Sequence, residues 1–253
     1  MLDMVQLYYF SPTGGTKKAG EIFCEGISAN VKAVDLGIRD EAAQAPECGL
    51  AVIAAPVFGG RIPAVVAEKL KGLDGSGKKA VTLAVYGNRA YEDALLELNN
   101  IVEERGFQVA ASAALVAQHS MVPEVGKGRP DSKDREEILG FAGKVLEKMQ
   151  KGAESEIVVP GNYPYKDGMS VPATPMSLPS CSRCGKCASV CPTGAIRLED
   201  GKVETSAEKC ILCMACCAAC PEHARILPPP LQGMMEEKLG ALKAVRKENE
   251  FYL

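Results

Sequence analysis

Apolar residues in the first 150 positions gather into short continuous runs and into stretches with helical spacing. Five runs rich in β-branched, aromatic and small apolar residues predict strands, at residues 4–10, 31–36, 50–55, 80–86 and 107–117. Apolar positions three and four apart predict helices, at residues 17–28, 64–71, 91–104 and 131–150. Asp131 or Ser132 is expected to cap the last of these helices. Because strands alternate with helices, the pattern predicts five βα units in an α/β fold, a doubly wound five-stranded parallel sheet whose ligand lies beyond the carboxyl ends of the strands.

The composition changes after residue 151. Prolines and glycines become frequent, which predicts a linker, and Tyr163 and Tyr165 suggest that part of this linker packs on a domain surface. A cysteine-rich stretch follows and is expected to end at the prolines 228–230, after which apolar residues recur at helical spacing. We therefore predict four parts, namely a first domain at 1–151, a linker at 152–176, a second domain at 177–230 and a C-terminal helix at 231–253.

The cysteines form two copies of one pattern. Cys181, Cys184, Cys187 and Cys191 precede Pro192 in a C-x2-C-x2-C-x3-C-P run, and Cys210, Cys213, Cys216 and Cys220 precede Pro221 in another. Three thiolates two residues apart can bind three irons of one cube, and the fourth iron takes its cysteine from the other run, as in two-cluster ferredoxins. Two [4Fe-4S] clusters are therefore predicted. Cluster I takes Cys181, Cys184, Cys187 and Cys220, and cluster II takes Cys210, Cys213, Cys216 and Cys191.

Two other uses of cysteine fit this pattern less well. Structural zinc also uses C-x2-C pairs, but it takes four ligands in two pairs rather than triplets followed by Cys-Pro. Disulfides are not expected, because Met1 is followed by a strand-like run without the charged start of a secretory leader. Cys217 fits neither spacing, and it is expected to be a small packed residue, as are Cys24 and Cys48.

The loop after the first predicted strand has the composition of a phosphate-binding turn. Residues 11–16 read SPTGGT and lie between a predicted strand and a predicted helix. The loop lacks the Lys of a Walker motif and the G-x-G-x-x-G of a dinucleotide fold, so ATP and NAD are poor candidates. Its hydroxyl and amide groups could bind a phosphate without a charged residue, those of Ser11, Thr13, Gly14, Gly15 and Thr16. Loops at 55–63 and 86–94 follow the third and fourth predicted strands and fall at the same edge of the sheet.

These loops and cysteine runs together resemble a known family. The first domain is similar to the flavodoxins, and the chain resembles bacterial flavodoxin/ferredoxin fusions called ferrodoxins through AAPVFGGRIP, VYGNRAYEDAL, QHSMVPEVGKGRPD and both cysteine runs. The resemblance implies a flavodoxin-like FMN-binding domain followed by a small α+β bacterial 2[4Fe-4S] ferredoxin domain. It implies that the first loop holds the FMN phosphate and that the ring lies between two further loops, at Pro56, Val57, Phe58, Gly59, Tyr86, Gly87, Asn88, Arg89 and Tyr91. The chain has no Trp, so Phe58, Tyr86 or Tyr91 is expected to stack on the ring.

Two further side chains stand near the same edge. Arg89 is expected to lie near the flavin and to favour its anionic reduced form, the alternative being a surface pair with Glu92. His119 follows the fifth predicted strand. A contact with flavin or substrate and a role as a hydrogen-bonded loop residue are both open for it.

Charge and hydropathy reduce the number of function classes that fit the chain. Residues 1–150 carry 17 Lys and Arg against 20 Asp and Glu, and the chain has a net charge of -3, so a nucleic-acid binder is not expected. No apolar run reaches the length of a membrane span, which favours a cytoplasmic protein without membrane insertion. We predict an electron-transfer protein that passes electrons between the two clusters and FMN within one chain, and that exchanges them with unidentified redox proteins. Two alternatives stay open: an FMN-dependent reductase of a small molecule fed by the clusters, and a ferredoxin with a flavin-free docking domain.

Overall fold

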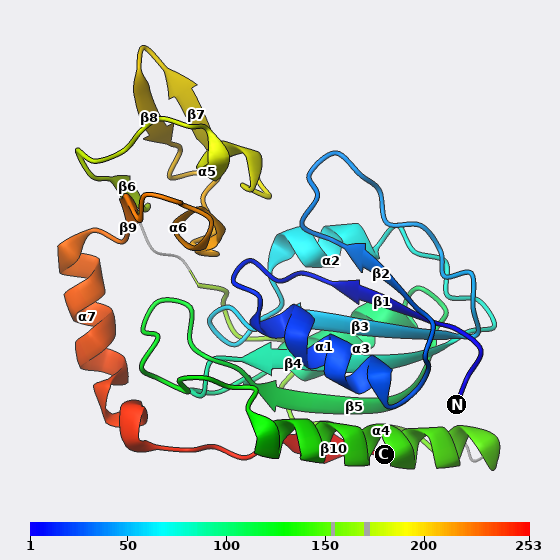
Figure 1. Cartoon of the computed structure of the whole chain (residues 1–253). Coiled ribbons are helices and arrows are strands. Elements are labelled where there is room, and N and C mark those ends of the chain that lie inside the picture. The colour runs from blue at the N-terminus through cyan, green and yellow to red at the C-terminus, as the bar shows by residue number, and fades with distance from the viewer. Residues whose placement is uncertain (153–154, 170–172) are drawn as a thin grey trace.

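A six-stranded sheet forms the centre of the first domain in the computed structural model of the chain, which describes residues 1–152, 155–169 and 173–253 (Figure 1). Its strands are β1 (Val5–Tyr9), β2 (Val31–Asp35), β3 (Leu50–Pro56), β4 (Lys79–Tyr86), β5 (Gln108–Val116) and β10 (Glu250–Tyr252). Their order is β10-β5-β4-β3-β1-β2, and β1 to β5 are parallel. The order 2-1-3-4-5 is that of flavodoxin-like doubly wound sheets, so this fold is confirmed. The sixth strand, β10, pairs antiparallel with β5 and was not predicted.

Four helices cover the two faces of this sheet. They are α1 (Gly15–Glu25), α2 (Ala64–Leu70), α3 (Ala94–Glu103) and α4 (Ser132–Gln150). Apolar side chains of α1 and α4 share one buried cluster with the strands, and those of α2 and α3 share the other. The prediction of five βα units is wrong at β2, because no helix lies between β2 and β3. Asp131 caps α4 as expected, accepting from Asp134 N at 3.1 Å while Asp134 Oδ2 accepts from Asp131 N at 2.8 Å.

The second domain is built twice from one backbone pattern. Its elements are β6 (Met176–Ser177), α5 (Lys186–Ser189), β7 (Ile196–Glu199), β8 (Lys202–Thr205), α6 (Ala215–Ala218) and β9 (Arg225–Ile226). Residues 29 apart correspond, since Cys210 follows Cys181 by that number. Corresponding residues share positive φ angles, namely Arg183 and Leu212 at 59° and 51°, Gly185 and Met214 at 79° and 67°, and Gly194 and His223 at 62° and 49°. The repeated cysteine run therefore folds into a repeated loop.

The C-terminal residues return to the first domain. Pro229 and Pro230 open α7 (Pro229–Leu239), because a helix's first turn does not need the amide that proline lacks. A 3-10 helix η1 (Gly240–Ala244) follows, and the chain then runs to β10 (Figure 1). The prediction of one helix over 231–253 is therefore wrong, because α7 ends at Leu239 and a strand follows. The end of the second domain at residue 230 stays a prediction.

The two domains pack against each other through apolar side chains. Met121, Val122 and Val125, from the loop after β5, share a buried cluster with Leu212 and Met214 of the second domain. The described part of the linker also lies on the first domain: Asn162 N and Lys166 N donate to Asp93 at 2.9 and 2.8 Å, and Tyr165 accepts from Asn100 at 2.6 Å. Within the described ranges, none of the helices has the length and apolar character needed to cross a bilayer.

Candidate functional site

The three loops predicted from the sequence meet in one pocket at the carboxyl edge of the sheet. The lining comes from the β1 loop, the end of β3, the end of β4 and the loop after β5, namely Pro12, Thr13, Gly15, Thr16, Pro56, Val57, Phe58, Val85, Tyr86, Gly87, Ala117, Gln118, His119 and Ser120. One further residue, Cys213, comes from the second domain. We call this site the edge pocket.

The β1 loop is shaped as an anion-binding turn. Gly14 has φ 91°, a conformation that strains any residue with a side chain, although the space beside it is open. Ser11 Oγ accepts from Lys17 N at 2.9 Å, so this hydroxyl caps the helix. Among the described residues, the amides of Gly15 and Thr16 at the start of α1 have no acceptor. A phosphate at this helix start would satisfy them.

Two aromatic rings form a wall of the edge pocket. Phe58 is half-buried and lies in a tight turn, with Phe58 N donating to Arg61 O at 3.0 Å. Tyr86 is buried at the end of β4. Tyr91 is not part of the lining: its ring lies 5.4 Å from that of Tyr86, and its hydroxyl donates to Glu250 at 2.6 Å. Phe58 and Tyr86 are thus the candidates that remain in reach of a ring bound there.

Asn88 and Arg89 are engaged elsewhere. Asn88, buried with φ 58°, donates to Val245 O at 2.7 Å and accepts from Lys247 N at 3.1 Å, so it fastens the C-terminal segment. Arg89 binds Glu92 through two bonds of 3.2 and 2.9 Å, which is the alternative weighed from the sequence. A contact between either side chain and a flavin stays a prediction.

His119 lies against Gly87 and lines the edge pocket together with the β1 loop. Its Nδ1 accepts from Met121 N and Val122 N, both at 3.2 Å, which leaves the ring proton on Nε2. Burial, with a smaller effect from Arg89, lowers the pKa of His119 to about 4, so the ring is neutral at pH 7. The sequence left its role open, and the structure makes it a fixed, neutral Nε2–H donor on the wall of the pocket.

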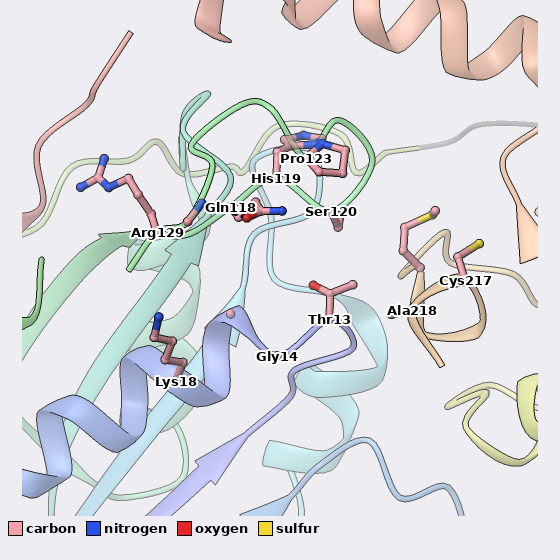
Figure 2. A pocket seen from close by; sticks show the side chains of 13 residues that line it. Thr13, Gly14, Lys18, Gln118, His119, Ser120, Pro123, Arg129, Cys217 and Ala218 are labelled. Atoms are coloured by element: carbon pink, nitrogen blue, oxygen red, sulfur yellow. Dashed lines mark hydrogen bonds between the residues drawn. The ribbon is translucent and has the colours of Figure 1, made fainter. Parts of the chain in front are cut away.

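A second cleft of about 580 Å³ separates the two domains beside the β1 loop. Figure 2 shows Thr13 and Ser120 on the first-domain wall of this cleft, opposite Cys217 and Ala218 of the second domain. Lys18 and Gln118 add further donors, and among the described residues no carboxylate lines the cleft. Its composition suits an anion.

The four cysteines that the sequence assigns to cluster II line one cavity. Cys191 lines it together with Cys210, Cys213 and Cys216, so the structure brings a residue of the first run to the triplet of the second. Cys191 Sγ accepts from Ala195 N at 3.2 Å, and Cys220 Sγ accepts from Ala224 N at 3.3 Å, the corresponding bond in the other half. No three His, Cys, Asp or Glu side chains of the described residues are placed to hold a single metal ion. Ligands of a cubane bind separate irons, so this donor set fits a four-iron cluster.

Burial and one internal bond set the acidity of the thiols around this cavity. Burial raises the pKa of Cys213 to about 12. A hydrogen bond from Cys217, helped by the charge of Arg225, lowers the pKa of Cys216 to about 6, and the pKa of Cys217 rises in turn. Cys217 thus packs beside a proposed ligand, as expected from the sequence.

A 4Fe-4S dicluster domain model matches residues 176–221. Over 53 residues the chain is 51% identical to the thiosulfate reductase electron transfer subunit PhsB of Salmonella typhi, which covers 20% of this chain and 28% of that one. It is 48% identical over 44 residues to one subunit of an ion-translocating oxidoreductase complex of Methanosarcina acetivorans, 17% of each chain. The chain thus spans less than a third of the length of these curated relatives.

Among solved structures, flavodoxin 1 of Bacillus cereus overlaps 57% of this chain and 98% of its own, at 16% identity and a TM-score of 0.45. The rubredoxin:oxygen oxidoreductase of Desulfovibrio gigas overlaps 59% of this chain and 37% of its own, at 17% identity and a TM-score of 0.43. The strand order, rather than these overlaps, assigns the fold of the first domain. The chain therefore joins a flavodoxin-like domain to a 4Fe-4S dicluster domain.

Proposed function

We propose that the chain is an electron-transfer protein that passes electrons between two [4Fe-4S] clusters and an FMN within one polypeptide. One observation carries the proposal: Cys213, assigned to cluster II, lines the edge pocket together with Phe58 and Tyr86 and packs against the apolar cluster of the first domain. A cluster ligand thus reaches the site that would hold the flavin. The name of the Salmonella relative, an electron transfer subunit, supports the same role.

The residues of the edge pocket suit FMN. The open amides of Gly15 and Thr16, with the Thr13 hydroxyl, would hold its phosphate, and Phe58 and Tyr86 would flank its ring. Neutral His119 would donate from Nε2 without adding charge. When bound, FMN exchanges electrons singly or in pairs, whereas each cluster exchanges one.

The ligand sets suggest an order for the redox centres. Cluster II, through Cys213, lies next to the edge pocket, and cluster I includes Cys184, which is exposed. Cluster I would therefore meet the partner, a redox protein yet to be identified, and the chain would need neither nucleic acid nor membrane insertion. We place it in the cytoplasm, because its cysteines fall in ligand runs rather than in a disulfide framework and thiols stay reduced in that compartment.

Rapid mixing under anaerobic conditions tests this function. The chain, loaded with iron, sulfide and FMN, receives less than one equivalent of a one-electron reductant, and absorbance follows the clusters and the flavin separately. We expect electrons to reach the flavin at a rate that does not depend on protein concentration, because the step is intramolecular. A rate proportional to protein concentration, or failure to retain FMN, would contradict the proposal. The Cys48→Ala variant is the control: Cys48 is remote from both sites, so its replacement should leave the rate of flavin reduction unchanged.

A reductase remains a second candidate because of the cleft between the domains. Its donors, Lys18, His119 and Thr13, suit an anionic substrate beside the proposed flavin site. Reoxidation of the reduced protein by small oxyanions distinguishes the two functions. A carrier reoxidises only with a protein acceptor, and a reductase shows saturable turnover with one of the anions.

A further inference from the structure

A buried cation lies beside the cysteines of both clusters. Arg225, at the start of β9, has 3% of its surface exposed. Its Nη atoms donate to Ser177 Oγ at 3.0 Å, to Pro175 O at 2.8 Å and to Thr205 Oγ1 at 2.8 Å. All three acceptors are neutral, and among the described residues no carboxylate pairs with Arg225. Arg225 therefore has no carboxylate counter-ion within the described part of the chain.

One donor of this guanidinium has no acceptor. Nε of Arg225 is buried and makes no hydrogen bond within the described part of the chain. Buried donors are nearly always paired, because an unpaired one loses its hydration without compensation. An acceptor that the chain carries only when its clusters are loaded would satisfy Nε.

The position of Arg225 points to the clusters as that acceptor. Pro175 and Thr205, which hold its Nη atoms, also line the cavity of cluster II. Arg225 itself lines a groove with Cys181, a ligand assigned to cluster I. The guanidinium thus lies within reach of both ligand sets.

Only one half of the internal repeat carries a cation at this position. Arg225 corresponds to Ile196, 29 residues earlier, which packs against Cys187, Cys191 and Cys216. The two halves share their ligand spacing and their backbone conformation, yet one half places an apolar side chain where the other places a charge. The cluster ligands do not require an Arg there, since Ile serves the equivalent place.

We propose that Arg225 is a tuning residue, which donates its Nε–H to a sulfur of the adjacent clusters and raises their reduction potentials. Each cluster gains one negative charge on reduction, and a buried cation without a counter-ion stabilises that added charge. The inference rests on the proposed cluster assignment. It makes the protein a weaker reductant than it would be with apolar residues in both halves.

Redox titration of Arg225→Ile, monitored by electron paramagnetic resonance of the reduced clusters, tests this role. Ile is the residue at the equivalent position, so the variant makes the two halves alike. At a fixed potential near the wild-type midpoint, we expect the ratio of reduced to oxidised cluster to fall about tenfold, which is about 59 mV for one electron. Arg225→Lys keeps the positive charge but loses the planar guanidinium and its several N–H donors. It should therefore shift the ratio of reduced to oxidised cluster less than Arg225→Ile does.

The control is Arg197→Ile, one residue after Ile196. Arg197 is exposed and pairs with Glu199 at 3.6 Å, so water screens its charge and its loss should leave the potentials unchanged. Iron content is measured in every variant. An Arg225→Ile protein with full iron and wild-type potentials would overturn the role of Arg225 while leaving the cluster assignment intact. If that variant loses iron, the deciding variant is Arg225→Gln, which is neutral and can still bond Pro175. A lowered ratio of reduced to oxidised cluster in this variant supports the role of Arg225, and an unchanged ratio refutes it.

Discussion

Replacing Asp134 with Asn tests the buried charge pair that fastens the C-terminal strand to the first domain. Asp134 is fully buried in the first turn of α4 and binds Arg129, of which 3% of the side chain is exposed, through both carboxylate oxygens. The same carboxylate accepts from Asn249 Nδ2 at 3.0 Å and Asp131 N at 2.8 Å. Asn keeps the shape but removes the charge, and its amide would face other donors.

The expected loss is large because both side chains of the pair are buried. Removing one partner of a buried ion pair costs about 3–5 kcal/mol, since the other charge stays buried without compensation. We expect Asp134→Asn to lower the free energy of unfolding by that amount. Arg246→Gln is the matched control: Arg246 binds the same carboxylate at 3.3 Å, but its side chain is 37% exposed, so its loss should cost less than about 1 kcal/mol. Urea unfolding followed by circular dichroism measures both.

The pH dependence gives a second readout with a defined sign. Burial acts to raise the pKa of Asp134, but hydrogen bonds from Arg129, Asp131 and Asn249 outweigh it, and the pKa is lowered. An Asp with a lowered pKa contributes stability above its unfolded value of about 3.9 and loses it as the pH falls through the folded value. The difference between wild type and Asp134→Asn should therefore be constant from about pH 8 to 5 and shrink below about pH 4. A difference under about 1 kcal/mol at pH 7, or one that grows in acid, would refute this reasoning.

Three further predictions concern the cofactors. Cys191→Ala should lose most of one cluster and destabilise the other, whereas Cys217→Ala should keep about eight irons per chain; iron assays that find equal content in both would contradict ligation across the halves. Thr13→Ala should weaken FMN more than riboflavin, which lacks the phosphate, and equal weakening in fluorescence titrations would exclude the β1 loop as the phosphate site. Phe58→Ala should weaken both flavins about tenfold, while Tyr91→Phe should leave both within about twofold; the reverse order would place the ring against Tyr91.

The parts of the fold that the sequence predicted are those coded by local pattern. Strands β3 and β4 are buried along nearly their whole length, so they read as continuous apolar runs. The β1 loop and the cysteine runs are short motifs whose spacing carries their geometry. In contrast, β10 has only three residues, Glu250–Tyr252, and becomes a strand because the edge of β5 offers it hydrogen bonds.

The parts that were not predicted depend on residues far apart in the chain. Asn88 reads as a loop residue beside a candidate ring site, but its partners, Val245 and Lys247, lie more than 150 positions later. Arg129 and Asp134 read as ordinary charges near a helix start, and only the folded chain shows that they are buried. The roles of His119 and Arg225 likewise come from neighbours that no local pattern identifies.

The attachment of the second domain at both ends bears directly on electron transfer. The second domain lies along the chain between α4 and β10, which both pack in the first domain, so it is an insertion between two elements of one fold (Figure 1). A domain joined by a flexible linker alone would have to find its docking site for each transfer, at an effective concentration in the millimolar range. Here the apolar contact of Met121, Val122 and Val125 with Leu212 and Met214, together with the return strand, places Cys213 at the edge pocket. In the proposed function the internal step would then need no encounter, and a partner protein would meet cluster I, whose proposed ligand Cys184 is exposed.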